Sequence, residues 1–356
     1  MRAADLGITI GRLERGPLNA ITDVPGVRVG HTTLIEGKDV RTGVTVIVPR
    51  ERPLWEEPVF AGWHRLNGNG ELTGTAWIDE AGLLMSPIGL TNTHSVGVVR
   101  DALAAATAAE HAPGDLFWVL PVVGETWDGT LNDVNGQHVR PEHVDEALRA
   151  ASSGPVAEGN VGGGTGMICH GFKGGVGTAS RVVSERTGGF AVGVLVQANH
   201  GRRDRLRIGG VPVGERISPE DVPLPAAPGG AGGGGSIIIV AATDAPLLPH
   251  QCRRLAQRAG LGVARTGGVG EHWSGDLFLA FATGNSGIPA SEYGCEPPLT
   301  ASLSMLADAY ITELFDAVVD ATEEAIVNAL LAAETMDGRD GIVAHGLDPE
   351  RLRSIL

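Results

Sequence analysis

Residues 227–247 read APGGAGGGGSIIIVAATDAPL, and the character of the chain changes at a single peptide bond within them. Upstream of that bond, a glycine tract ends at Gly235 and offers no side chains for packing. Downstream, Ser236 opens an apolar, β-branched run over residues 237–240, which predicts a buried strand. A segment with great backbone freedom therefore meets a rigid strand at one residue that carries a hydroxyl group.

Cleavage of the bond between Gly235 and Ser236 would give Ser236 both a hydroxyl and a free α-amine. An α-amine has a pKa of about 8, so much of it is neutral near neutral pH, and it can act as a general base toward the neighbouring hydroxyl. Glycine at position 235 tolerates the backbone angles that bring its carbonyl within reach of that hydroxyl. The plainer interpretation, a linker after which a serine merely starts a strand, stays open on these residues alone.

Strands and helices alternate irregularly on both sides of this junction. Buried strands are predicted within residues 116–126, 190–201 and 274–285, and helices within residues 96–112, 140–153, 244–262 and 300–335. The last helix carries two apolar stripes, so we expect it to be buried on two sides. Residues 214–235, rich in proline and glycine, are interpreted as a flexible linker. The whole pattern predicts an α+β or layered α/β fold in a single domain, 1–356.

The composition restricts the kinds of partner that the chain can have. Apolar residues make up 42% of the 356 residues, enough for a substantial core. The net charge of −15 repels phosphate backbones and anionic membranes, so nucleic-acid and membrane partners are not expected. The first residues lack the apolar stretch of a signal peptide, and no apolar run reaches the roughly 18 residues of a membrane span. We therefore expect a cytoplasmic protein.

Cysteines, histidines and glycine-rich loops give no cofactor motif. The chain has three cysteines without a C-x-x-C pair, Cys169, Cys252 and Cys295, which we interpret as free thiols. The histidines show no metal-binding spacing, so no metal is expected. In the glycine-rich stretch GFKGGVGTAS, Lys173 precedes Thr178 by five residues, whereas a phosphate-binding loop needs the two to be adjacent. The glycines are interpreted as sites of tight turns and close backbone approach; the alternative, that their N–H groups line a substrate pocket, stays open.

Six blocks of this sequence, in this order, carry a resemblance to a known family. They are ITDVPGVRVGH (21–31), VVGETWDGTLNDVNG (122–136), SGPVAEGNVGGGTGMICHGFKGGVGTASR (153–181), VGVLVQANHGRR (192–203), GGGGSIIIVAATDAPL (232–247) and SGDLFLAFATGN (274–285). Through these blocks, residues 20–350 resemble the serine peptidases of the L-aminopeptidase/D-esterase type, which include the β-peptidyl aminopeptidases.

The resemblance implies a fold and a maturation step. Members of this family are made as inactive precursors that cleave themselves before a serine. Ser236 stands at the matching position, so the two chains would be 1–235 and 236–356, and they would stay together. The implied fold is a four-layer α-β-β-α sandwich, similar in outline to N-terminal nucleophile (Ntn) hydrolases but differently connected. The resemblance also implies a homo-oligomer of such chain pairs.

Residue roles are implied in the same way. Asn199 matches the asparagine whose amide donates to the oxyanion, a task suited to a fixed N–H group. Ser274 and Asp276 match a serine and an acidic residue that contact the nucleophile and its amine, although the family often has glutamate at the second position. Glu125 matches the glutamate that pairs with the free amino group of the substrate. Without the resemblance, all four could be residues of turns or strand ends.

Position 127 departs from the family. The better-known members place a tyrosine there, whose hydroxyl helps to stabilise the oxyanion, and this chain has Trp127. Its only tyrosines are Tyr293 and Tyr310. An indole N–H can donate a hydrogen bond but cannot accept one. Trp127 is therefore expected either to donate from a shifted position or to shape the pocket.

Together these observations identify a self-processing serine aminopeptidase as the first hypothesis. It would act on short peptides, amino-acid amides and esters through an acyl-enzyme on Ser236. Acyl transfer of the ornithine acetyltransferase type is one alternative, but those enzymes cut before threonine, and Ser236 argues against them. The other alternative is an uncleaved homo-oligomer whose glycine loops bind a small ligand without catalysis.

Overall fold

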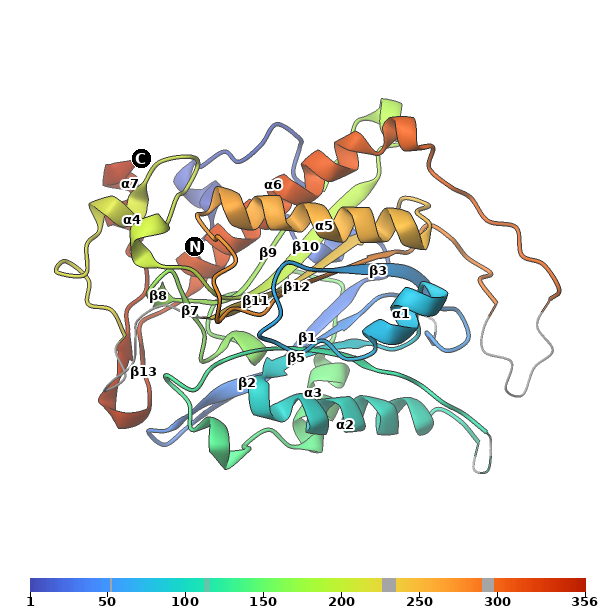
Figure 1. Ribbon diagram of the computed structural model, residues 1–356, viewed down its shortest axis with the longest axis horizontal. Coiled ribbons are helices and arrows are strands. Elements are labelled where there is room, and N and C mark those ends of the chain that lie inside the picture. The colour runs from blue at the N-terminus through green and yellow to red at the C-terminus, as the bar shows by residue number, and fades with distance from the viewer. Residues whose placement is uncertain (52, 113, 115, 226–234, 290–297) are drawn as a thin grey trace.

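Two β-sheets lie face to face with helices outside them (Figure 1). The computed structural model describes residues 1–356 except 52, 113, 115, 226–234 and 290–297. The larger sheet has the strand order β4 (Leu83–Leu84), β3 (Val59–Arg65), β12 (Asp276–Ala282), β11 (Ser236–Thr243), β10 (Ala191–Asn199) and β9 (Gly175–Val182). The smaller sheet has the order β1 (Arg28–Glu36), β2 (Val40–Val48), β5 (Ile88–Asn92) and β6 (Val122–Thr126).

Strand β11 lies in the middle of the larger sheet and is buried on both faces. Ile237 and Ile239 pack toward the helices, and Ile238 and Val240 pack toward the other sheet. A strand covered on both sides gains from a continuous apolar run, which is why the sequence SIIIVAAT folds this way. The strand predicted after Ser236 is confirmed.

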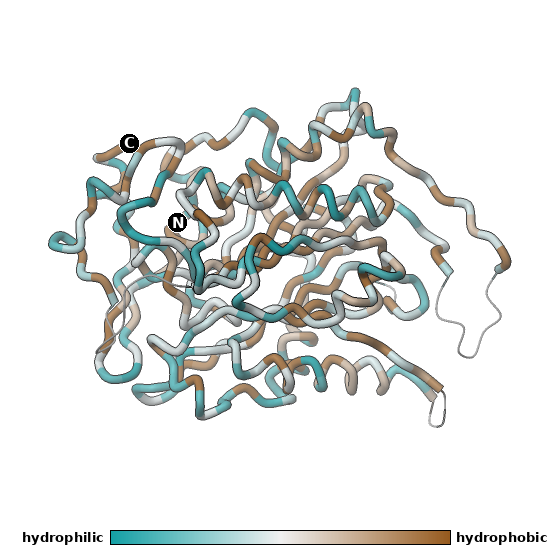
Figure 2. The backbone as a smooth tube through the Cα atoms, in the orientation of Figure 1, coloured by the Kyte–Doolittle hydropathy of each residue, from teal (hydrophilic) through white to brown (hydrophobic). Residues whose placement is uncertain are grey.

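The outer layers consist of long helices. The larger sheet is covered by α5 (Pro249–Arg265) and α6 (Thr312–Ala332), and the smaller sheet by α2 (Val96–Ala108) and α3 (Pro141–Ala150). Hydrophobic segments gather on the stacked strands, while many outer turns are hydrophilic (Figure 2). The layers follow the order α-β-β-α, as predicted.

Several short helices and strands complete the fold. They are α1 (Thr75–Ala81), α4 (Val213–Arg216), α7 (Pro349–Ile355), β7 (Ile168–Cys169), β8 (Phe172–Lys173), β13 (Met336–Asp337) and β14 (Val343–Ala344). In the described part of the chain, no helix combines the length and the apolar character that a membrane crossing requires. Cys169 and Cys252 are buried free thiols, as predicted, and Cys295 lies outside the described residues.

Two elements are shorter than predicted. The helix expected over 300–335 begins only at Thr312, because the chain before it runs along the loop that precedes α5, where Leu306 N donates to Pro246 O at 2.9 Å. Its burial on two sides is confirmed. The strand expected over 116–126 is reduced to β6, since Pro121 directly before it has no N–H to give to a sheet.

The segment 214–235 differs in part from the expected linker. Residues 214–216 belong to α4, and Ile217 is buried in the core between the larger sheet and its helices. Residues 226–234 lie outside the described residues. Strand β11 pairs with β10 on one side and β12 on the other, so the parts of the chain before and after residue 235 share one sheet.

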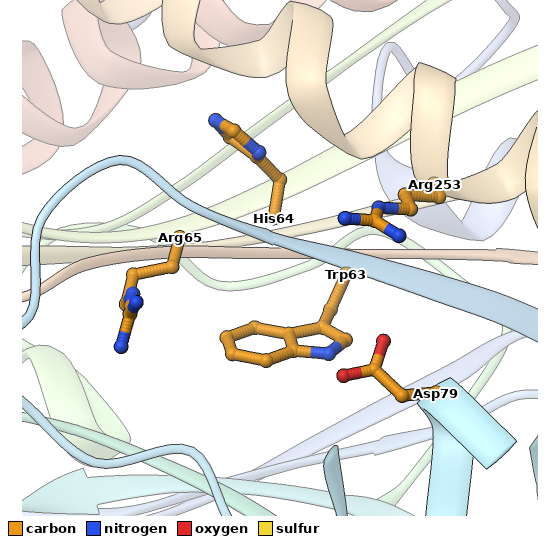
Figure 3. Close-up of a pocket in the computed structure, with 5 residues that line it drawn as sticks. All are labelled: Trp63, His64, Arg65, Asp79 and Arg253. Atoms are coloured by element: carbon orange, nitrogen blue, oxygen red, sulfur yellow. The ribbon is translucent and has the colours of Figure 1, made fainter. Parts of the chain in front are cut away.

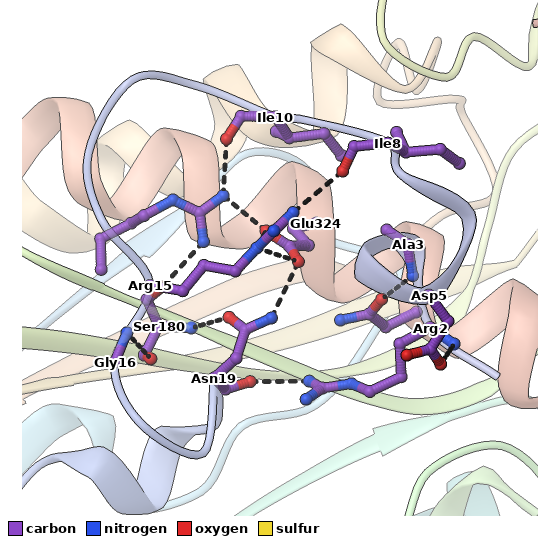
Figure 4. Close-up of polar contacts among 12 residues, drawn as sticks. Arg2, Ala3, Asp5, Ile8, Ile10, Arg15, Gly16, Asn19, Ser180 and Glu324 are labelled. Carbon is purple, nitrogen blue, oxygen red and sulfur yellow. Dashed lines mark hydrogen bonds and ion pairs between the residues drawn. The ribbon is translucent and has the colours of Figure 1, made fainter.

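A buried ion pair joins α6 to the larger sheet at Glu324, and Figure 4 shows Arg15 and Asn19 reaching the same carboxylate. Arg181 Nη2 lies 2.6 Å from Glu324 Oε2, and neither side chain is exposed to solvent. Arg15 Nε donates to Glu324 Oε1 at 2.9 Å, and Asn19 Nδ2 donates to the same oxygen at 2.8 Å. This cluster attaches residues 15–19 to the helix layer.

Removing the Glu324 charge should destabilise the fold strongly. In a Glu324→Gln variant, Arg181 would remain buried without its counter-charge, so we expect the free energy of unfolding to fall by about 3–5 kcal/mol. Urea denaturation followed by circular dichroism measures the change. As a control, Glu350→Gln removes an exposed pair with Arg353 and should change it by less than about 1 kcal/mol. A loss no larger than in the control would contradict the prediction.

Candidate active site

Three neighbouring strands bring the predicted residues together at one end of the larger sheet. Ser236 is the first residue of β11 and is only 4% exposed. In the register of the sheet, Ser236 lies opposite Asn199 of β10, and Ile237 lies opposite Asp276 of β12. The Ser236 hydroxyl accepts a hydrogen bond of 3.0 Å from Gly275 N. The hydroxyl is therefore held within the sheet between two of the residues that the sequence singled out.

Asp276 forms a small polar cluster beside this serine. Ser274 Oγ donates to Asp276 Oδ1 at 2.5 Å, and Asn67 Nδ2 donates to Asp276 Oδ2 at 3.0 Å. In return, Asp276 N donates to Asn67 Oδ1 at 2.6 Å. Burial raises the pKa of Asp276, and the hydrogen bonds from Ser274 and Asn67 lower it in part. Both carboxylate oxygens are thus engaged, and Asn67 is a site residue that the sequence did not reveal.

Glu125 reaches the same place from the smaller sheet. It lies on β6, and its Oε1 accepts a 3.0 Å hydrogen bond from Glu71 N while its Oε2 accepts one from the Thr93 hydroxyl. Burial raises the pKa of Glu125, and these hydrogen bonds lower it in part. A Cβ built on Gly70 would stand 3.2 Å from Glu125 Oε1 and 3.0 Å from Gly275 Cα. One glycine therefore separates this carboxylate from the residue that holds the Ser236 hydroxyl.

The side-chain amide of Asn199 is fixed at both ends. Its Nδ2 donates to Trp127 O at 2.9 Å, and its Oδ1 accepts from Ile168 N at 2.7 Å. The backbone of Trp127 therefore belongs to the site. Trp127 as a residue is 43% exposed, and its indole ring packs edge-on against His94, with 6.1 Å between the ring centroids. The geometry places the indole at the rim of the site.

Gly235, directly before the serine, is buried against β10. A Cβ at this position would stand 1.7 Å from Asn199 O and 3.1 Å from Asn199 Nδ2. The backbone of Asn199 is held by its pairing with β11 and cannot move away cheaply, so only glycine fits here. The residue before Ser236 thus lies in contact with the amide group that was predicted to act in catalysis.

Among the cavities that described residues line, two contain residues of β3 or of the loop that follows it. One of about 530 Å³ borders the Asp276 cluster and is lined by Asn67, Gly68, Asn69, Gly270, Glu271, His272 and Trp273. The other, of about 320 Å³, is lined by Trp63, His64, Arg65, Asp79 and Arg253. In Figure 3, Trp63 and His64 point to opposite sides of β3. Of these two cavities, the first shares a residue, Asn67, with the hydrogen bonds of the candidate site.

Comparison with known proteins identifies a family and relatives that match nearly the whole chain. The model of peptidase family S58 matches residues 19–344. A beta-peptidyl aminopeptidase, BapA, from Sphingosinicella microcystinivorans is 48% identical over 375 residues, which cover 100% of this chain and 91% of the relative. The BapA of Sphingosinicella xenopeptidilytica is 46% identical over 370 residues, with coverage of 100% and 90%.

Solved structures agree with this comparison. A Burkholderia sp. beta-aminopeptidase superposes with a TM-score of 0.94 at 56% identity, and 100% of this chain and 98% of that chain are covered. The L-aminopeptidase D-Ala-esterase/amidase of Ochrobactrum anthropi gives a TM-score of 0.90 at 45% identity with the same coverage. It is described as a prototype for the serine aminopeptidases and a new variant among the Ntn hydrolase fold. The predicted fold class is confirmed.

Proposed function

The chain belongs to peptidase family S58 and is a hydrolase, and from this premise we propose that it is an aminopeptidase that matures by cutting itself before Ser236. The observation that carries this proposal is the position of that serine. It heads the central strand, its hydroxyl accepts from Gly275 N, and Asn199 and Asp276 lie beside it on the two neighbouring strands. A nucleophile that heads a rigid strand can become a chain end without losing its position.

In the proposed self-cleavage, Ser236 Oγ attacks the carbonyl carbon of Gly235. The hydroxyl proton passes to the leaving nitrogen, the new C–O bond replaces the C–N bond, and the peptide becomes an ester with a free amine on Ser236. Water then hydrolyses the ester, which leaves a carboxylate on Gly235 and restores the hydroxyl. The products 1–235 and 236–356 remain associated, because β11 is paired on both sides with strands of the larger sheet.

The freed amine then serves as the general base for substrates. It takes the proton of its own hydroxyl, which attacks the acyl carbon of the substrate, and it returns the proton to the leaving amine. Asp276, supported by Ser274 and Asn67, holds the amine in place. Asn199 Nδ2, close to Gly235, is the proposed donor to the oxyanion. Water finally releases the acyl group from Ser236.

Glu125 gives this enzyme its preference for unblocked N-termini. A buried carboxylate attracts the ammonium group of a substrate and binds a neutral, acylated amine poorly. The proposed substrates are short peptides, amino-acid amides and esters, with β-amino acids included because similar proteins bear the name beta-peptidyl aminopeptidase. In this proposal Trp127 shapes the rim of the pocket through its indole ring.

Intact mass spectrometry together with an amidase assay tests the proposal. We expect the purified protein to give two masses, which correspond to residues 1–235 and 236–356, and to release the amine from amino-acid amides with a free amino group. N-acetylated amides should not be cleaved. A single uncut chain that hydrolyses these amides would refute the proposed mechanism.

The tight fit of Gly235 gives a prediction about maturation. In a Gly235→Ala variant, the methyl group would collide with Asn199 O, so the junction would shift away from its reactive position. We expect the cut fraction after purification to fall at least about tenfold, since a displacement of roughly 1 Å can cost 10²-fold in rate. A denaturing gel measures this fraction. Gly97→Ala is the control, since nothing lies within 4 Å of its added Cβ; equal cutting in both variants would contradict the prediction.

We also propose that cut chain pairs assemble into a homo-oligomer. Between β12 and α6, the described residues Leu299, Leu303 and Met305 expose their apolar side chains, and Leu299 is 100% exposed. Exposed apolar side chains of this kind mark protein interfaces. Light scattering during size-exclusion chromatography should give a mass above that of one chain, and replacing all three with serine should reduce it.

A further inference from the structure

A buried thiol and two buried imidazoles meet behind the candidate active site. Cys169 and His170 lie at the end of β7, and His200 directly follows β10. Each offers one ligand atom, and these atoms lie within 4.8 Å of one another. Among the described residues, no other group of three or more histidine, cysteine and acidic side chains is placed in this way. The chain spacing conceals this cluster, because 29 residues lie between the two histidines.

The hydrogen bonds of the cluster leave ring nitrogens without partners. Cys169 Sγ lies 3.8 Å from His200 Nδ1, and His170 Nδ1 lies 3.1 Å from Arg202 O. The Nε2 atoms of His170 and His200 are buried and have no hydrogen-bond partner in the described structure. A histidine that donates from one nitrogen to a backbone carbonyl has its other nitrogen free for a metal. The His170 contact has this form.

The donor set and the surrounding charges indicate which ion fits. One thiolate and two imidazoles favour a soft ion such as Cu⁺ or Zn²⁺. The cationic side chain of Arg203 packs close by: its Nε donates to His170 O at 3.1 Å. Zn²⁺ with one thiolate would leave a net charge of +1 beside this guanidinium, whereas Cu⁺ with one thiolate is neutral. Burial penalises the charged combination.

We propose that Cys169, His170 and His200 bind one Cu⁺ ion, with the Cys169 thiol releasing its proton to solvent on binding. The ion would join two segments that also hold Asn199. Ile168, the residue before Cys169, donates from its N to Asn199 Oδ1 at 2.7 Å. His200 directly follows Asn199 in the chain. The bound ion would therefore fix the position of the Asn199 amide. Binding itself depends in no way on self-cleavage.

Anaerobic copper binding tests this site directly. All proteins carry Cys295→Ser, so that the thiol outside the described residues cannot contribute, and Cu⁺ is offered in competition with bicinchoninate. We expect one equivalent to be bound, and Cys169→Ser and His200→Gln to weaken binding at least 100-fold. Cys252→Ala is the matched control, because Cys252 is an equally buried free thiol that contacts Phe60 O, and it should keep the full equivalent.

Three outcomes would overturn the proposal. They are the absence of stoichiometric Cu⁺, the same affinity in the Cys169→Ser protein, and tighter binding of Zn²⁺ than of Cu⁺ in a parallel titration. X-ray absorption at the copper edge of the parent protein gives a readout that does not depend on the folding of any variant. One sulfur and two imidazole nitrogens around copper would support the site, and a first shell without sulfur would contradict it. The thermal midpoint should rise with Cu⁺ in the parent and stay unchanged in Cys169→Ser.

Discussion

A Ser236→Ala variant should purify as one uncut chain without aminopeptidase activity. The variant keeps the strand and loses only the hydroxyl that accepts from Gly275 N, so the fold should persist. Without the hydroxyl, the carbonyl of Gly235 meets no nucleophile and the bond stays intact. Loss of the nucleophile should lower kcat on the order of 10⁶-fold. Intact mass spectrometry and an amino-acid amide assay measure the two effects.

Two controls separate this chemistry from a folding defect. Circular dichroism should give the same spectrum for Ser236→Ala and the parent protein. Ser236→Cys places a thiol nucleophile where the hydroxyl was, and a thiol can replace the hydroxyl in such reactions. This variant should therefore still cut itself and hydrolyse activated esters. Cleavage between residues 235 and 236 in the Ser236→Ala variant would mean that another group performs the cut. Acetyl transfer from N-acetylornithine to glutamate by the parent protein would favour the transferase alternative.

The buried strands were predictable because a strand that is buried on both faces has a continuous run of apolar residues. Residues 237–240 and 276–282 are nearly all apolar, and no exposed strand or amphipathic helix has that composition. The start of α6 was not predictable. Leu303 and Leu306 extend its apolar pattern backward, but the backbone of Leu306 bonds to Pro246 in another loop, a tertiary contact that local pattern cannot reveal.

The candidate site likewise contains residues that the sequence predicted and one, Asn67, that it did not. Ser236 follows from the contrast between a glycine tract and a strand, and the other predicted residues follow from a family resemblance. Asn67 lies in the loop LNGNG, where nothing distinguishes it from Asn69. It reaches Asp276 only because β3 pairs with β12, with Arg65 opposite Leu277. Partners that a sheet brings together from distant segments leave no local signal.

Glu125→Gln should separate substrate binding from self-cleavage. The amide keeps the size of the side chain and can still accept from Glu71 N, but it offers no charge to an ammonium group. Truncating a buried charge pair costs several kcal/mol, so we expect kcat/KM for free amino-acid amides to fall about 10²–10³-fold, mainly through KM. The protein should still cut itself, because the Gly235 junction presents no ammonium group. Steady-state kinetics and a denaturing gel measure both effects.

The pH dependence gives the same variant a second readout. Burial raises the pKa of Glu125, so its charged form is lost at a higher pH than for an ordinary glutamate, and KM of the parent should increase as the pH falls through that raised pKa. In Glu125→Gln this increase at acidic pH should disappear. The exposed neighbour Glu71 provides the matched control, and Glu71→Gln should change kcat/KM less than about threefold, since an exposed charge contributes little. If Glu125→Gln kept the KM and pH profile of the parent, the ammonium group of the substrate would have to bind elsewhere, and the cavity beside Asp276 would be the next place to search.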